Sequence, residues 1–243
     1  MKKLLIAAVL ASISLSASAA ETIRFAAEAS YPPFEFIDAN NKMQGFDIDL
    51  ANALCKEMQA NCTFTNQAFD SLIPSLKFKR FDAVISGVDI TPERLKQVAF
   101  TKPYYDNSAL FIAQKGKIAD LAALKGKRVG MQNGSTHQKF LLEKHPEITA
   151  VPYDSYQNAI LDLKNGRLDA VFGDTAVVNE WLKQSHELMP VGDKISDADY
   201  FGTGLGIAVR QNNTELLGKL DAALAKVKAD GTYQTIYKKW FQQ

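Results

Sequence analysis

Strand-like and helix-like segments alternate along almost all of this 243-residue chain, and this alternation constrains its fold more than any other feature. Short apolar runs such as TIRFAAEA, FDAVISG and LDAVFG are typical of buried strands. The segments FDIDLANALCKEM and SYQNAILDLKNG space their apolar residues as a helix does. Parallel strands need a crossover connection, which is usually a helix. The sequence therefore predicts an α/β protein with mainly parallel sheets.

The first nineteen residues have the features of a secretory signal peptide. Lys2 and Lys3 are followed by an apolar run over residues 4–15, and residues 17–19 match an A-x-A cleavage site. The apolar run is too short for a transmembrane anchor. We therefore expect an exported mature chain of about 220 residues, which is enough for one large domain or two small ones. The formal net charge of +1 argues against a nucleic-acid partner.

Cys55 and Cys62 are the only cysteines in the sequence. In an oxidising compartment, two cysteines this close together are typical of one disulfide. Two buried free thiols are the alternative. Metal ligation is a weaker alternative, because neither cysteine has a nearby histidine or a second C-x-x-C motif. We expect a local bond on the helix that contains residues 50–58, and no metal site.

One internal similarity predicts two lobes that face each other. Segments 75–87 (SLKFKRFDAVISG) and 162–174 (DLKNGRLDAVFGD) both have the pattern of a helix end, a basic turn and a strand. Chance is one explanation, and two lobes with equivalent sheets are the other. Ligands of open α/β sheets bind outside the carboxyl ends of the strands. Ser86-Gly87 and Gly173-Asp174 would then border the same cleft from opposite sides.

The glycine-rich segment 201–210 (FGTGLGIAVR) is expected to return the chain from one lobe to the other, paired with a strand around residues 108–113. We predict lobe 1 from residues 20–109 and 206–243, and lobe 2 from residues 110–205. The crossings are expected near residues 108–112 and 202–207. Two crossings of this kind permit hinge motion.

The motifs of common enzymes are missing from the sequence. None of the three histidines, His137, His145 and His186, lies in an H-E-x-x-H motif or beside a candidate nucleophile. GTGLG at 202–206 precedes a predicted strand, which is the wrong order for a dinucleotide-binding turn. NGSTHQ at 133–138 lacks the lysine of a phosphate loop, and Ser135 or Thr136 is better explained as a helix N-cap. We therefore expect no catalytic residues and no cofactor.

Polar and aromatic residues gather instead where predicted strands end. Each of them alone is best explained as a helix cap, a surface charge or a core residue. Their shared position at the carboxyl ends of strands indicates a binding site. The candidate ligand-binding residues are Glu28, Tyr31, Phe69, Ser86, Gly87, Asp89, Arg94, Ser135, Thr136, His137 and Asp174.

The charges of this set fit a zwitterionic α-amino acid. Arg94 can bind a carboxylate with two parallel hydrogen bonds. The backbone amides of Gly87 and Thr136 can donate to the same oxygens. Asp174 and Asp89 can accept hydrogen bonds from an ammonium group. Two aromatic rings in the set can enclose an aliphatic or planar side chain.

The mature chain resembles the periplasmic amino-acid-binding proteins of ABC importers, and most closely the arginine-binding group within the lysine/arginine/ornithine- and histidine-binding family. The resemblance spans essentially the whole mature chain. It rests on YPPFE, GFDIDLANALCKEM, FDSLIPSLK, DAVISGVDITPER, YFGTGLGIAVR and DGTYQTIYKKWF. It implies the type II periplasmic-binding fold, a two-strand hinge and a Cys55–Cys62 bridge. It also implies a periplasmic monomer that captures L-arginine for an inner-membrane ABC permease.

Residue by residue, the resemblance implies that Arg94 holds the ligand carboxylate and that Asp174 holds the α-ammonium group. Tyr31 and Phe69 would stack on the ligand side chain, with Glu28 near its distal end. The aromatic pair would suit the planar guanidinium of arginine.

Three positions depart from the pattern of relatives that take lysine, ornithine or histidine. Those relatives tend to have Asp where this chain has Glu28, Ser where it has Asp89, and Gln where it has His137. A broader protein for basic amino acids is therefore one alternative. A periplasmic dehydratase on the same fold, with Glu28 as general acid, is another. A sensor module is not expected, because the sequence contains no attached transmembrane or signalling segment.

Overall fold

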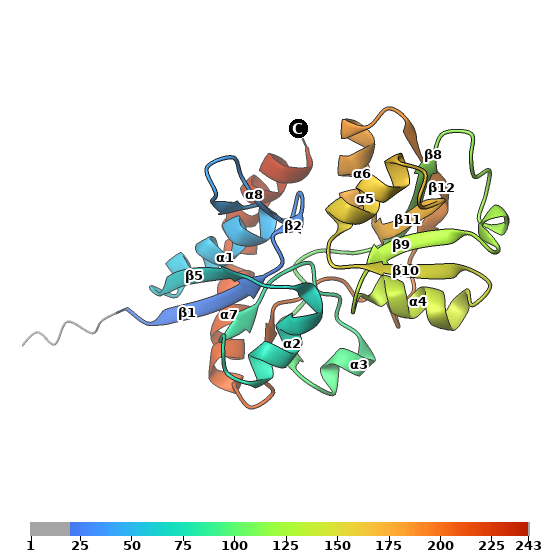
Figure 1. Cartoon of the computed structure of the whole chain (residues 1–243). Helices are drawn as coiled ribbons and strands as arrows, with labels where there is room; N and C mark the ends of the chain where they lie inside the picture. Colours follow the sequence, from blue (N-terminus) through green and yellow to red (C-terminus); the bar gives the residue numbers. More distant parts are fainter. Residues whose placement is uncertain (1–19, 243) are drawn as a thin grey trace, which may run out of the picture.

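The computed structural model describes residues 20–242, and the predicted signal peptide, residues 1–19, lies outside this part. The described residues form two lobes side by side, each with its own five-stranded sheet (Figure 1). Within residues 20–242, no helix has both the length and the apolar composition that a membrane crossing requires. The predicted two-lobe α/β architecture is confirmed.

The sheet of lobe 1 has the strand order β5-β1-β6-β13-β7. Strand β1 runs parallel to its neighbours β5 and β6, as the alternation of strands and helices predicts, whereas β13 is antiparallel to its neighbours β6 and β7. The strands are β1 (Thr22–Ala27), β5 (Asn61–Asn66), β6 (Ala83–Val84), β7 (Ala99–Phe100) and β13 (Ala208–Val209). The helices are α1 (Phe46–Glu57), α2 (Phe69–Lys77), α3 (Pro92–Leu95), α7 (Thr214–Ala229) and α8 (Thr232–Phe241).

The sheet of lobe 2 has the order β10-β9-β11-β8-β12, with β10, β9 and β11 parallel and β8 and β12 antiparallel to the strands beside them. The strands are β8 (Ala109–Gln114), β9 (Arg128–Gln132), β10 (Thr149–Tyr153), β11 (Ala170–Asp174) and β12 (Leu188–Ile195). The helices are the 3₁₀ turn η1 (Ala122–Leu124), α4 (Thr136–Lys144), α5 (Tyr156–Lys164) and α6 (Thr175–Gln184).

A small antiparallel sheet of β2 (Ser30–Tyr31), β3 (Glu35–Ile37) and β4 (Met43–Gln44) follows β1. The sequence did not predict it, because strands of two or three residues are too short to show an alternating pattern. This sheet places the ring of Tyr31 at the border of lobe 1 and the carboxyl group of Glu35 inside it, since both side chains are buried.

The chain crosses between the two sheets twice, through residues 101–108 after β7 and through residues 196–207 after β12. Leu205 in the second crossing pairs with Tyr105 in the first and with Asp89 in lobe 1. The predicted pairing of segment 201–210 with residues 108–113 is therefore wrong, since β8 pairs with β11 and β12. β12 was missed because its sequence LMPVGDKI contains Pro190 and Gly192, which weaken a strand pattern. As the edge strand of its sheet, β12 tolerates the proline.

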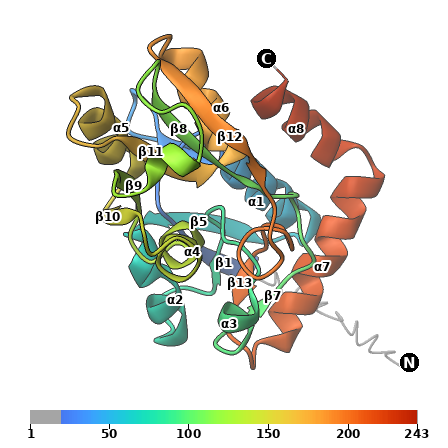
Figure 2. The same ribbon diagram turned by 90° about the vertical axis from the view of Figure 1, so that its right-hand side faces the viewer.

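The amphipathic helix α1 holds lobe 1 together behind its sheet. Its buried face includes Phe46, Leu50 and Leu54, each fully shielded from solvent. This face packs against α7 and α8, which lie beside α1 in both views (Figures 1 and 2). Burying large apolar side chains of this kind contributes about 1.5–3 kcal/mol each to folding. The sequence-predicted helix over residues 46–58 is thereby explained by its packing.

Cys55 in the last turn of α1 and Cys62 in β5 form the predicted disulfide, with their Cα atoms 6.0 Å apart. β5 is the outer strand of its sheet, so the bond ties the end of α1 to the sheet edge. The two cysteines are separated by 7 positions in the chain, so the bond closes a short loop.

We expect the double substitution Cys55→Ser and Cys62→Ser to lower the free energy of unfolding by about 2–3 kcal/mol, because the bond restricts the unfolded chain. The effect is modest because the closed loop is short. Urea denaturation of the oxidised protein, the chemically reduced protein and the double variant measures this effect. The reduced protein and the variant should unfold at the same urea concentration. Equal stability of all three would contradict a stabilising role.

Candidate functional site

Side chains from the strand ends of both lobes converge on one buried cleft. A cavity of about 10 Å³ remains between them, which is room for at most one water molecule. Its lining comes from lobe 1 (Tyr31, Phe69, Gly87, Asp89) and from lobe 2 (Gln132, Ser135, Thr136, His137, Tyr156, Asp174). Most of the candidate residues are therefore brought together. Glu28, Ser86 and Arg94 stand directly behind this lining, and any larger ligand needs the lobes to separate.

Arg94 is held at the cleft by the short helix α3. Thr91 caps this helix by accepting a hydrogen bond from the Arg94 amide, and Pro92 occupies its first turn, where a missing N–H is tolerated. The guanidinium lies 5.6 Å from the centre of the Phe69 ring. It donates to the carbonyl oxygen of Asp89 at 3.0 Å and, across the cleft, to that of Gly134 at 3.4 Å. The longer bond is at the limit of hydrogen-bond geometry, so this edge of the guanidinium is weakly engaged.

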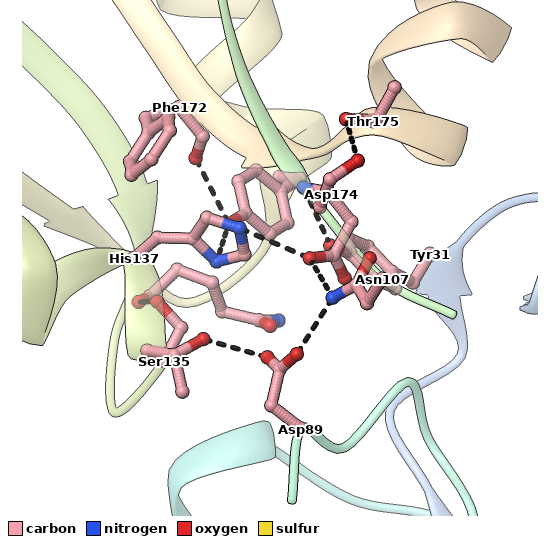
Figure 3. A network of polar contacts seen from close by, with 12 residues as sticks. Tyr31, Asp89, Asn107, Ser135, His137, Phe172, Asp174 and Thr175 are labelled. Atoms are coloured by element: carbon pink, nitrogen blue, oxygen red, sulfur yellow. Dashed lines mark hydrogen bonds and ion pairs between the residues drawn. The ribbon is translucent and has the colours of Figure 1, made fainter. Parts of the chain in front are cut away.

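Two acidic side chains, one from each lobe, meet at the side-chain amide of Asn107. Its nitrogen donates to Oδ1 of Asp89 and to Oδ1 of Asp174, each at 2.7 Å (Figure 3). Thr136 donates its hydroxyl to the second oxygen of Asp89 at 2.7 Å. Burial, and then the charge of Asp174, raises the pKa of Asp89 to about 8. The cleft therefore holds two carboxyl groups for which a cation would be a favourable partner.

Asn107 was not among the predicted site residues. It lies in the first crossing between the lobes rather than at the end of a sequence-predicted strand. A lone asparagine in the segment YYDNS has no periodic or spacing signal that would single it out. Only the pairing of the two lobes shows that its amide stands between the two acids.

Aromatic side chains enclose Asp174. The Tyr31 hydroxyl donates to Oδ2 of Asp174 at 2.6 Å, and its ring stacks on Tyr156 with 5.2 Å between the ring centres. Burial and the nearby Asp174 charge raise the pKa of Tyr31, which keeps its hydroxyl protonated as a donor. Nε2 of His137 lies 3.2 Å from Oδ1 of Asp174 but makes no hydrogen bond, whereas Nδ1 lies 3.2 Å from the Tyr156 hydroxyl (Figure 3). Tyr156 was also missed, because it begins helix α5 and looks like a core residue in sequence.

The backbone amide of Gly87 does not have the role expected from the sequence. It donates to Oδ2 of Asp47 at 2.9 Å inside lobe 1, so the expectation that it is free to donate to a ligand carboxylate is not supported. Gly87 has φ +52, and a Cβ atom would lie 3.2 Å from the Tyr31 ring. The glycine is therefore required by its backbone conformation and by the adjacent ring. A ligand approaching the backbone is not needed to explain it.

Ser86 and Glu28 also make contacts that the sequence did not reveal. The Ser86 hydroxyl accepts from the Glu28 amide at 2.9 Å and donates to Oε1 of Glu35 at 2.7 Å. Oε2 of Glu28 accepts from the side-chain amide of Gln132 in lobe 2 at 3.1 Å. Burial raises the pKa of Glu28. Gln132, the last residue of β9, thus separates Glu28 from the cavity and is a further wall residue that was missed.

Helix α4 begins at the cleft, with Ser135 as its N-cap and Thr136 as its first residue. The Ser135 hydroxyl accepts from the Gln138 amide at 3.2 Å, which confirms one of the two N-caps considered from the sequence. Amide groups in the first turn of a helix favour negatively charged groups. Within residues 20–242, no group of three or more His, Cys, Asp or Glu side chains is arranged to hold a metal ion.

Comparison with known proteins adds independent information. Residues 23–243 match the family described as bacterial extracellular solute-binding proteins, family 3. The ABC transporter arginine-binding protein 1 of Escherichia coli (strain K12) is 66% identical over 243 residues, which is all of both chains. An arginine-binding periplasmic protein of Mannheimia haemolytica is 52% identical over 88% of each chain.

A solved structure extends this similarity to the fold. It is a periplasmic binding protein of Salmonella typhimurium, described as having high arginine specificity. It is 56% identical, has a TM-score of 0.89, and is matched over 91% of this chain and 100% of its own.

We expect Asn107→Ala to destabilise the protein by about 1–3 kcal/mol, because two buried carboxyl groups lose their shared donor. The Asn107 bond lowers the pKa of Asp89, so the variant should hold its Asp89 proton to higher pH. A group with a raised pKa in the folded state loses its stabilising contribution as the pH rises through that pKa. The decrease in the free energy of unfolding, relative to the wild type, should therefore be larger at pH 9 than at pH 6.

Urea unfolding at both pH values measures this loss. Ser108→Ala is the matched control, since Ser108 is the neighbouring residue and bonds to Thr175 instead of to either acid. A loss in Asn107→Ala that is the same at both pH values, or the same as in the control, would contradict the role given to Asn107.

Proposed function

Because this chain belongs to family 3 of the bacterial extracellular solute-binding proteins, we propose that it captures L-arginine in the periplasm and delivers it to an ABC importer. Relatives named as arginine-binding proteins at 66% and 52% identity support this proposal. The observation that carries it is the meeting of Asp89 and Asp174 at one buried cleft between two lobes, with the Arg94 guanidinium directly behind, bonded to the Asp89 carbonyl. A zwitterionic ligand with an additional positive charge complements this set.

The carboxylate of the ligand would lie at Arg94 and the start of α4. The guanidinium edge that now reaches the Gly134 carbonyl at 3.4 Å is the one that can turn to a carboxylate. A bidentate pair of this type is stronger than a neutral hydrogen bond. The Thr136 amide, in the first turn of α4, would add a donor and the favourable field of the helix N-terminus.

The α-ammonium group would lie between Asp174 and Asp89. It carries three N–H donors, so it could replace the single Asn107 amide nitrogen that the two acids now share. A cation at this place would lower the raised pKa of Asp89 and drive release of its proton. Ligand uptake should then depend on pH in the range around pH 8.

The guanidinium of the ligand would lie between Tyr31 and Phe69. The Arg94 guanidinium carbon lies 5.6 Å from the centre of the Phe69 ring, so this ring already makes a cation–π contact. Glu28 would accept from the distal N–H groups once Gln132 releases it. A planar guanidinium stacks on aromatic rings in a way that an ammonium group cannot match. Arginine should therefore bind more tightly than lysine or ornithine, with histidine weaker and glutamine weakest.

The lobe boundaries and the assembly belong to the same proposal. Lobe 1 would comprise residues 20–109 and 206–243, and lobe 2 residues 110–205, with residues 1–19 removed as a signal peptide. The proposed ligand contacts are divided between the lobes, so a ligand that touches both favours their closed arrangement. The chain would act as a monomer that presents both lobes to the permease.

Catalysis is the competing function, with Glu28 as a general acid for a dehydratase reaction. The transport names of the relatives favour binding. Incubation with prephenate or arogenate separates the two functions, because only a dehydratase converts these substrates.

We expect Arg94→Ala to weaken arginine binding by about 2–5 kcal/mol, because the ligand carboxylate would lose its charged, bidentate partner. Calorimetric titration of ligand-stripped protein with arginine, lysine and glutamine measures it, and all three ligands should be affected. Arg167→Ala is the matched control, since this guanidinium is exposed and paired with Asp162 on α5. Near-normal affinity in Arg94→Ala would show that Arg94 does not hold the carboxylate.

Glu28→Gln should weaken arginine binding by about tenfold or more, because a charged hydrogen bond contributes about 1.5–3 kcal/mol. The effect on glutamine should be small, so the preference of the protein for arginine over glutamine should narrow. Glu57→Gln, which changes a lobe 1 carboxyl group paired with Lys226, is the control. Equal losses for all ligands, or a wild type that prefers lysine, would place Glu28 away from the ligand side chain.

A further inference from the structure

Two acidic side chains, Glu35 in β3 and Asp47 in α1, lie behind the lobe 1 wall of the cleft. Both are completely shielded from solvent. Oε2 of Glu35 and Oδ1 of Asp47 are buried atoms without a hydrogen-bond donor. The two carboxyl groups are held side by side, because Glu35 accepts from the Ser86 hydroxyl and Asp47 accepts from the amide of the next residue, Gly87. Two ionised carboxylates in such contact repel each other, so they cannot both be charged without a large cost.

The remaining oxygens of the two groups are fully used. Oε1 of Glu35 accepts from the Ser86 hydroxyl at 2.7 Å. Oδ2 of Asp47 accepts from the Gly87 amide at 2.9 Å and from the Tyr104 hydroxyl at 2.8 Å. One proton placed between Oε2 and Oδ1 would therefore satisfy both unpaired atoms. No other rearrangement of the surrounding donors is needed.

The surroundings favour a single negative charge on the pair. The titratable groups that act on it are Glu28, Tyr104, Asp174 and Tyr233, and each of these is an acid. Burial, followed by the Asp47 charge, raises the pKa of Glu35 well above its usual value. Burial also raises the pKa of Asp47, to about 7. A protonated Glu35 that donates to an ionised Asp47 is consistent with both directions.

We propose that Glu35 and Asp47 share one proton and that this pair positions the segment Ser86–Gly87, on which the lobe 1 wall of the cleft is built. The Ser86 hydroxyl, which donates to Glu35, also accepts a hydrogen bond from the Glu28 amide at 2.9 Å. Gly87 lies directly under the Tyr31 ring. Glu35 and Asp47 are positioning residues, since neither lines the cavity.

The pair also reaches the hinge. Tyr104, whose hydroxyl donates to Asp47, lies in the first crossing, and its amide donates to the Leu205 carbonyl in the second crossing at 2.9 Å. The tyrosine side chain is almost fully buried. The two carboxyl groups are therefore connected both to the wall of the cleft and to the two crossings between the lobes.

Amide substitutions distinguish a shared proton from two independent acids. In Glu35→Gln, the side-chain NH₂ can donate to Oδ1 of Asp47 while its oxygen still accepts from Ser86. In Asp47→Asn, the side-chain NH₂ can donate to Glu35 while its oxygen accepts from Gly87 and Tyr104. Each single variant keeps every hydrogen bond. In the double variant two NH₂ groups face each other, and a bond is lost.

The proton itself is tested by the pH dependence of unfolding. Glu35 has a raised pKa in the folded state, so its stabilising contribution is lost as the pH rises above its unfolded pKa of about 4.3. Glutamine does not titrate. The unfolding equilibrium constant of the wild type, divided by that of Glu35→Gln, should therefore rise by up to about tenfold per pH unit between about pH 5 and pH 7. Urea unfolding at three pH values measures this ratio.

Glu57→Gln is the control, because Glu57 is partly exposed and pairs with Lys226. The corresponding ratio for this variant should not rise with pH. A ratio for Glu35→Gln that stays constant with pH would overturn the shared proton, because it would mean that Glu35 is already ionised. This test does not use a ligand, so it stands apart from the proposed arginine function.

The positioning role is tested by arginine affinity and rests on the proposed function. Glu35→Gln and Asp47→Asn should each bind arginine within about threefold of the wild type, whereas the double variant should bind at least about tenfold more weakly. Circular dichroism checks that each variant is folded. Equal affinities in all four proteins, or a single variant as weak as the double, would overturn the positioning role. A wild type that fails to bind arginine would contradict the proposed function alone, because the pH test would still report the pair.

Discussion

The Asn107 side chain donates from one nitrogen to two buried carboxyl groups that belong to different lobes. The arrangement of the cleft depends on this contact, because Asp89 and Asp174 would otherwise face each other without a donor between them. Asn107 can lie there because the first crossing carries the chain directly between the two sheets. A group with more N–H donors and a positive charge would complement the same two acids better. The contact therefore connects the architecture of the hinge with the kind of ligand that the cleft favours.

Acidic side chains occur in two layers on the lobe 1 side of the cleft. Asp89 faces the cavity, whereas Glu35 and Asp47 lie behind the wall and hold it from within. Burial is the largest cause of the raised pKa in all three. The front layer faces the cavity, where a cation could reach it, whereas internal donors reach only one oxygen of each acid in the back layer. The same chemical group thus has two physical roles, which are set by its distance from the cavity.

Aromatic residues fix the position of Asp174, the lobe 2 acid of the cleft. Tyr31 contacts Asp174 through its hydroxyl and Tyr156 through its ring, so it joins the lobes by two kinds of interaction. The cavity of about 10 Å³ follows from this close packing. Separating the lobes would break the Tyr31–Asp174 bond and at least one of the two Asn107 bonds. A ligand that replaces both would restore the closed arrangement with its own groups.

Local patterns in the sequence determined much of this protein. The βαβ alternation predicted mainly parallel sheets, because parallel pairing requires crossovers that are usually helical. Each sheet does contain three parallel strands, but its other two strands are antiparallel to their neighbours. Thr91 and Ser135 specified the starts of α3 and α4, because a hydroxyl N-cap acts within a few residues. Cys55 and Cys62 are close enough in the chain to predict their bond.

Only the tertiary structure determined the features that depend on residues distant in the chain. β12 is a strand because it pairs with β8, although its own sequence is interrupted by Pro190 and Gly192. The Gly87 amide bonds to Asp47, which is 40 positions away in the chain, so no local pattern reveals that it is engaged. Asn107 contacts Asp174 over a separation of 67 positions. These contacts arise only when the two lobes are packed, because side chains distant in the chain become neighbours only in the folded protein.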